Sequence, residues 1–146
     1  MKINNVVVIG SGTMGSGIAA QLCNANIPVT LLDLKTEISQ KAKERIEKSR
    51  PPLLIDKSKI DGIKIGNISD DFNVVSEADW IVEAVVERID IKHDIYEKIF
   101  KQRKKDSIVS SNTSSIPISV LSQKMSEGDK KDFCITHFFN PVRYMD

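Results

Sequence analysis

The most constraining feature of this sequence is a regular alternation of short apolar runs with longer segments of helical periodicity. Short apolar runs predict strands at residues 5–9, 28–33, 62–69, 80–85, 106–110 and 133–136. Residues 14–26, 36–49, 53–60, 89–103 and 117–125 are predicted helices, the last ended by a turn at Gly128. Strands that alternate with helices pair in parallel through right-handed crossovers. We therefore expect an α/β fold with a three-layer, doubly wound, mostly parallel sheet.

Composition and charge exclude several classes of protein. A chain of 146 residues fits one domain, and 21 Lys+Arg against 20 Asp+Glu lack the excess positive charge of a dedicated nucleic-acid binder. The longest apolar runs are far shorter than a membrane span, and the first one is too short to predict a signal peptide. Cys23 and Cys134 have no metal-site spacing and read as reduced thiols, with a redox pair as the alternative. We expect a cytoplasmic protein without metal, nucleic-acid or membrane partners.

A glycine-rich turn follows the first predicted strand. Residues 10–15 read G-x-G-x-x-G and open the first predicted helix, which is the context that a dinucleotide site requires. Gly10 permits the tight turn, Gly12 lets a pyrophosphate approach the backbone, and Gly15 lets helix and strand pack closely. The first helical N–H groups, around Thr13 and Met14, would face the phosphates. The turn therefore predicts a Rossmann-type NAD-binding domain, although a purely structural glycine turn is the alternative.

An acidic residue ends the second predicted strand. Asp33 is placed to accept hydrogen bonds from the ribose hydroxyls of the adenosine half. Its charge would repel a 2′-phosphate, so it favours NAD over NADP, although the nearby Lys35 would weaken that repulsion.

Four motifs in order resemble the 3-hydroxyacyl-CoA dehydrogenase family. They lie at residues 10–19, 82–87 with Lys92, 111–115, and 137–141, each at the end of a predicted strand. The resemblance covers the family's N-terminal NAD-binding domain, here residues 1–146. It implies an enzyme that interconverts (S)-3-hydroxyacyl-CoA and 3-ketoacyl-CoA, in fatty acid β-oxidation or butanoate metabolism.

The resemblance also implies roles for individual residues. His137 would be the general base, and a hydroxyl at Ser114 would bond the reacting oxygen. Asn140 would lie beside the nicotinamide. Further cofactor contacts are implied for Ala84, Glu87 and Lys92, and a contact with CoA for Ser49.

Structural alternatives exist for these residues. Ser114 could cap a helix or form a turn, and Glu87 could cap the following helix. His137 could be an ordinary histidine at a strand end. His93 and residues 101–105 lie on a charged helix and read as solvated.

Two parts of the family pattern are expected beyond residue 146. One is a glutamate that orients the histidine, and the other is a helical domain for substrate binding and dimerisation. The expected partners are an acyl-CoA substrate, a second copy through the helical domain, and a fused enoyl-CoA hydratase. Residues 1–146 alone are expected to be inactive.

Two other functions compete with this one. A β-hydroxyacid dehydrogenase would share the glycine turn, but it would rely on a lysine from a later domain and lack the 137–141 motif. A non-enzymatic NAD-binding module need not keep Ser114 together with His137. The presence of both residues favours the dehydrogenase.

Overall fold

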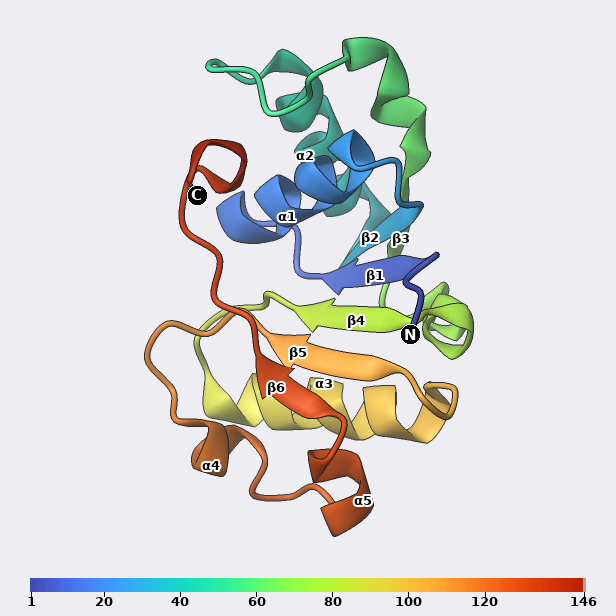
Figure 1. The fold of residues 1–146 in the computed structure, drawn as a ribbon, viewed down its shortest axis with the longest axis vertical. Helices are drawn as coiled ribbons and strands as arrows, with labels where there is room; N and C mark the ends of the chain where they lie inside the picture. The colour runs from blue at the N-terminus through green and yellow to red at the C-terminus, as the bar shows by residue number, and fades with distance from the viewer. Residues whose placement is uncertain (146) are drawn as a thin grey trace.

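The computed structural model describes residues 1–145 and contains one six-stranded sheet in which all strands are parallel. The strand order is β3-β2-β1-β4-β5-β6, with the first crossover running outward from β1 and the chain then returning to β4. Figure 1 shows the strands side by side. Their bounds are β1 Val6–Ile9, β2 Val29–Asp33, β3 Ile63–Asn67, β4 Trp80–Glu83, β5 Ile108–Ser111 and β6 Phe133–Ile135.

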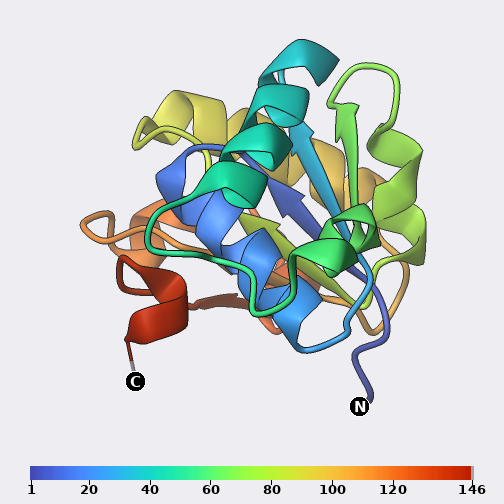
Figure 2. The same cartoon turned by 90° about the horizontal axis from the view of Figure 1, so that it is seen from above.

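Helices cover both faces of this sheet (Figures 1 and 2). Helices α1 and α2 pack on one face, and α3 packs on the other. Three short 3-10 helices, η1 to η3, and two short α-helices complete the described chain. The bounds are α1 Thr13–Asn24, α2 Thr36–Lys48, η1 Lys57–Gly62, η2 Phe72–Glu77, α3 Ile89–Gln102, α4 Ile118–Leu121, α5 Glu127–Lys130 and η3 Val142–Tyr144.

The alternation of side chains along β1 divides the core into two layers. Val6 and Val8 pack under α1 and α2, whereas Val7 and Ile9 pack under α3. All four are fully buried, as expected for a central strand of a parallel sheet. The predicted three-layer, doubly wound fold is confirmed, and the sheet is wholly parallel. No helix within residues 1–145 combines the length and apolarity needed to span a bilayer.

Most predicted elements are present with small shifts at their ends, but the segment between α2 and β3 differs in its secondary structure. The predicted helix at residues 53–60 is a 3-10 helix at Lys57–Gly62. The side chain of Asn24 on α1 explains the shift. Its amide donates to the carbonyl of Leu53, and its oxygen accepts from the N–H of Ile55. These side-chain bonds hold the backbone before η1 in a loop.

The helix predicted at residues 117–125 is also shorter than expected. Helix α4 ends at Leu121, and Ser126 begins α5 by accepting from the N–H of Asp129. Gly128 therefore lies inside α5, and its assignment to a turn after the helix is wrong. The 3-10 helix η2 has no counterpart in the sequence prediction.

The C-terminal segment returns to the first helix. Figure 1 shows it passing the ends of β4 and β5 to reach α1. A Cβ at Gly17 of α1 would lie 2.9 Å from Val142, so the glycine allows η3 to pack there. Arg143 donates to the carbonyl of Pro52 at 2.7 Å and fastens this end to the loop after α2.

Candidate cofactor and catalytic site

A large cleft of about 860 Å³ lies at the carboxyl edge of the sheet. Open α/β sheets bind their ligands at this edge, where the strand order reverses between β1 and β4. The turn after β1 and the loops after β2, β4, β5 and β6 contribute to it. The predicted site residues that line the cleft are Gly10, Gly12, Thr13, Met14, Asp33, Ala84, Glu87, Ser114, His137 and Asn140.

The glycine turn has the geometry of a pyrophosphate cradle. Gly10 has a φ of +103°, in the left-handed region, and a Cβ there would lie 2.4 Å from the carbonyl oxygen of Ala84. A Cβ on the buried Gly15 would lie 1.8 Å from the carbonyl oxygen of Gly10. A Cβ on Gly12, in contrast, would meet nothing within 4 Å. The space above Gly12 is therefore open to a ligand.

Helix α1 begins at this open space. Gly12 is its N-cap and has no side chain, so the first N–H groups of α1, starting at Thr13, face the cleft without a capping oxygen. A diphosphate supplies both the oxygen acceptors and the negative charge that a helix N-terminus favours. The residues present thus fit the pyrophosphate of a dinucleotide.

The carboxylate of Asp33 is bonded within the protein and still has one lone-pair site free for a ligand. One carboxylate oxygen accepts from the N–H and the hydroxyl of Ser11, at 2.8 and 2.6 Å, and the other accepts from the N–H of Leu34. An ionised carboxylate offers about four lone-pair sites, so one remains for a ribose hydroxyl. Asp33 therefore fixes the glycine turn and lines the cleft at the same time.

Beyond Asp33 the cleft has an apolar wall that the sequence analysis missed. Leu34, Ile38 and Ile68 line it, and Arg45 reaches it with its guanidinium bonded to the carbonyl of Ser11. Leu34 is 71% exposed, so its side chain is open to a ligand in the cleft. The face of a flat aromatic base such as adenine would cover this surface.

Glu87 stands at the rim of the cleft in the loop after β4. Its carboxylate accepts from Thr113 at 2.7 Å and pairs with Lys92 at 3.3 Å. Burial acts to raise the pKa of Glu87, but the Thr113 hydrogen bond and the Lys92 charge outweigh it and hold this pKa below its usual value. Glu87 is therefore an anion at neutral pH, placed to accept hydrogen bonds from a ribose.

Lys92 faces Glu87 and not the cleft. Its side chain is 1% exposed, and its ammonium bonds Glu83 at 2.6 Å and the carbonyl of Val85 at 3.2 Å. In this structure it reaches the cleft only through Glu87, and a direct contact with the ribose stays a prediction. Glu83 is fully buried and also accepts from Ser111 and Tyr96.

The loops after β5 and β6 carry the two predicted catalytic residues, and both line the cleft. Asn112 accepts from the N–H of Phe138 at 2.9 Å, which ties the two loops to each other. Ser114 and His137 both line the cleft, and both are exposed. The imidazole of His137 packs edge-on against Phe139, with ring centroids 4.9 Å apart. Within residues 1–145 it has no hydrogen-bond partner, so its nitrogens can meet a substrate.

Ser49 lies outside the cleft. Its hydroxyl donates to the carbonyl of Ile46 and accepts from the N–H of Leu53, so it ends α2 and starts the following loop. Its contact with CoA stays a prediction.

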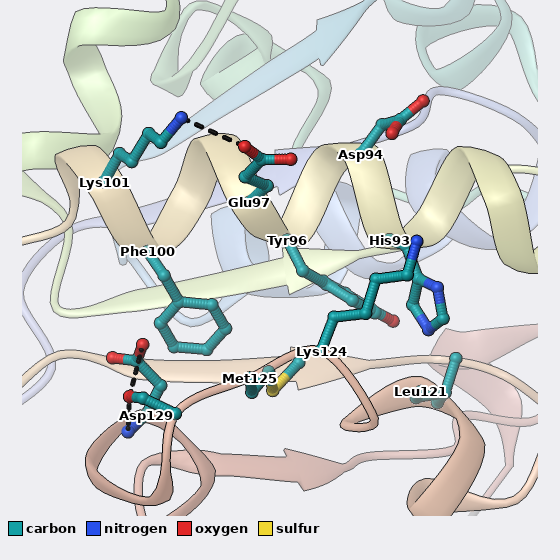
Figure 3. Close-up of a pocket in the computed structure, with 11 residues that line it drawn as sticks. His93, Asp94, Tyr96, Glu97, Phe100, Lys101, Leu121, Lys124, Met125 and Asp129 are labelled. Atoms are coloured by element: carbon teal, nitrogen blue, oxygen red, sulfur yellow. Dashed lines mark hydrogen bonds and ion pairs between the residues drawn. The ribbon is translucent and has the colours of Figure 1, made fainter.

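A second, smaller cavity of about 410 Å³ lies between α3 and the α4–α5 segment (Figure 3). His93 lies on α3 as predicted and is partly exposed, and its ring bonds the carbonyl of Val120 at 2.8 Å in this cavity. Arg103, in the predicted solvated run, pairs with Asp129 and Asp132. None of the residues predicted for the active site lines this cavity.

The polar edge of the cleft carries the serine, histidine and asparagine of the resemblance, and comparison with known proteins decides the family. The family described as 3-hydroxyacyl-CoA dehydrogenase, NAD binding domain, matches residues 5–146. The chain belongs to this family. Its cofactor is NAD, and the family is one of oxidoreductases. This match disfavours the β-hydroxyacid dehydrogenase alternative.

Curated relatives and solved structures agree with the match. A probable 3-hydroxyacyl-CoA dehydrogenase of Deinococcus radiodurans is 42% identical over 99% of this chain and 44% of its own length. A putative fatty acid oxidation complex trifunctional enzyme of Rickettsia felis is also 42% identical, over 21% of its length. The structure of 3-hydroxybutyryl-CoA dehydrogenase from Escherichia coli gives a TM-score of 0.86 at 25% identity, over 99% of this chain and 31% of that one. The chain thus spans between a fifth and a half of these relatives.

Proposed function

We propose that this 3-hydroxyacyl-CoA dehydrogenase domain forms the cofactor half of an enzyme that interconverts (S)-3-hydroxyacyl-CoA and 3-ketoacyl-CoA. The observation that carries the proposal is the shared lining of one cleft. The glycine turn and Asp33 lie at one end, and Ser114, His137 and Asn140 lie along the same cleft on the loops after β5 and β6. A dinucleotide and a hydroxyl substrate can therefore meet there.

His137 acts as the general acid/base in this proposal. When the alcohol is oxidised, the imidazole of His137 takes the hydroxyl proton while the C3–H bond breaks. In the reverse direction, the imidazolium returns the proton to the oxygen. When bound, the nicotinamide supplies the acceptor for the hydrogen and the electron pair that leave C3. A histidine suits the role because an imidazole gains and loses a proton near neutral pH.

Ser114 and Asn140 position the reactants. The hydroxyl of Ser114 donates to the reacting oxygen and stabilises the charge that develops on it. Asn140, with both donor and acceptor groups, holds the nicotinamide end of the cofactor. The apolar wall formed by Leu34, Ile38 and Ile68 holds the adenine end.

The remaining parts of the proposal concern the whole protein. We propose that a helical domain supplies the acyl pocket, the acidic partner of His137 and a dimer contact. Fusion to an enoyl-CoA hydratase is supported by relatives named as trifunctional or multifunctional fatty acid oxidation enzymes. The free cysteines, Cys23 and Cys134, support a cytoplasmic location, where thiols stay reduced.

A spectrophotometric assay with acetoacetyl-CoA and NADH tests the proposed function. A longer protein that joins this domain to its helical domain is expected to oxidise NADH, whereas residues 1–146 alone bind NADH with negligible turnover. The separate domain lacks the acyl pocket, so the substrate is not held beside His137. Equal rates for both proteins would contradict the need for the helical domain. Absence of turnover by the longer protein would favour a non-enzymatic NAD-binding module.

A further inference from the structure

A buried carboxylate with no part in the proposed reaction lies directly behind the cleft. Glu83 ends β4, is fully buried and does not line the cleft. One of its oxygens accepts from Lys92 at 2.6 Å and from the N–H of Val85 at 2.9 Å. The other accepts from Ser111 at 2.7 Å and from the hydroxyl of Tyr96. Burial and the charge of Glu83 raise the pKa of Tyr96, so its hydroxyl keeps the proton that it donates.

The contacts of Glu83 continue through its neighbours and close on themselves. We call the resulting set of five residues the Glu83 ring, and it joins the end of β4, the helix α3 and the loop after β5. The ring runs from Glu83 to Lys92 (2.6 Å), Glu87 (3.3 Å), Thr113 (2.7 Å), Ser111 (3.2 Å) and back to Glu83 (2.7 Å). Tyr96 bonds Glu83 but stands outside this ring.

Only one member of the Glu83 ring reaches the cleft. The other four are between 0% and 3% exposed, whereas the side chain of Glu87 is 42% exposed. Thr113, a member of the ring, directly precedes Ser114 in the chain, so the ring also holds the backbone that leads to Ser114. In addition, the N–H of Asn112 donates to the carbonyl of Glu83, and Asn112 accepts from Phe138 beside His137.

A buried ion pair of this kind adds little to stability. The cost of removing both charges from water offsets most of their attraction, and apolar replacements are often as stable. A closed set of directed bonds does, however, fix the relative positions of the loops that carry it. The arrangement is therefore better suited to positioning than to holding the fold together.

We propose that the Glu83 ring positions the cofactor-facing carboxylate of Glu87, with Glu83 as its buried anchor. The inference rests on the proposed function of the cleft, because Glu87 matters only if a ribose binds there. Loosening the ring lets the carboxylate of Glu87 turn toward solvent, so the cofactor must order it again on binding. Removing any one hydrogen bond of the ring should therefore weaken NADH binding.

Two substitutions separate positioning from general stability, because they remove hydroxyls that donate to the same oxygen of Glu83. Ser111→Ala opens the ring, whereas Tyr96→Phe leaves it closed. NADH binding to residues 1–146 would be followed by fluorescence, and the melting temperature of each variant would be measured alongside. We expect Ser111→Ala to weaken binding about tenfold, the equivalent of one charge-assisted hydrogen bond, and Tyr96→Phe to leave it within about twofold.

Thr113→Val cuts the ring at its other end with almost no change in side-chain shape, and it decides the matter if Ser111→Ala does not fold. It should weaken NADH binding about as much as Ser111→Ala. Equal affinities for wild type and the ring variants would overturn the proposal while leaving the proposed function intact. Equal losses in Ser111→Ala and Tyr96→Phe would also overturn it, because the effect would then follow stability. If the wild-type chain does not bind NADH, the cofactor assignment and the positioning role fall together.

Discussion

Replacing His137 by Gln is expected to lower the kcat of the longer dehydrogenase by about 10²–10⁴-fold while leaving NADH affinity nearly unchanged. The loss should appear equally in kcat and kcat/KM, because a base acts only in the transition state. His137 lies on the loop after β6, whereas the pyrophosphate cradle lies on the turn after β1, so the cofactor keeps its principal contacts. Steady-state kinetics with acetoacetyl-CoA, together with an NADH titration, give both quantities.

The second histidine provides a matched control for this substitution. His93→Gln makes the same change in the cavity between α3 and α4, away from the cleft (Figure 3). It should leave kcat within about twofold, as expected for a change away from the reacting atoms. Ser114→Ala should be less damaging than His137→Gln, because water can replace one hydroxyl hydrogen bond. A loss of NADH affinity in His137→Gln as large as the loss of turnover would make this histidine structural.

Gly12→Ala is expected to weaken NADH binding roughly 100-fold or more without lowering the melting temperature appreciably. In the structure its Cβ meets no atom within 4 Å, and the φ of −67° suits alanine. The methyl group would, however, occupy the space through which the pyrophosphate approaches the start of α1. Calorimetric titration with NADH and a thermal melt measure the two effects.

Gly15→Ala should behave differently from Gly12→Ala, which makes the pair informative. Its Cβ would lie 1.8 Å from the carbonyl oxygen of Gly10, a backbone overlap that forces the turn to open. Both stability and NADH binding should therefore fall. Gly128→Ala in α5, where the nearest atom is Ser126 Oγ at 3.8 Å, is the neutral control. Undiminished NADH affinity in Gly12→Ala would show that the pyrophosphate lies elsewhere.

The sheet was predictable because local pattern and global fold agree along most of the chain. The unbroken apolar run of β1 and the apolar spacing of Ala42 and Ile46 on α2 predict that these residues are buried, and they are. The loop at residues 53–56 was not predictable, because the side chain of Asn24 on a different element supplies its hydrogen bonds. Such long-range bonds leave no periodicity in the segment that they control.

The site shows the same division between local and long-range information. The glycine turn and Asp33 could be predicted, since their spacing follows from a strand, a tight turn and a helix. Two contacts depend instead on which side chains the folded sheet brings together. They are the bond between Asp33 and Ser11 and the inward turn of Lys92 to Glu83. Glu83 gave only a weak signal in the sequence, as an acid at the end of an otherwise buried strand.

The most direct test of the central claim is to follow the two histidines of residues 1–146 by proton NMR while NAD is added. His137 lines the cleft that we assign to the cofactor, and His93 lines the other cavity, so each imidazole reports on one site. The spectrum of His137→Gln assigns the signals. We predict that NAD shifts the His137 resonances in a saturable manner and leaves those of His93 in place. A saturable shift of His93 alone, or binding that moves neither histidine, would contradict the account.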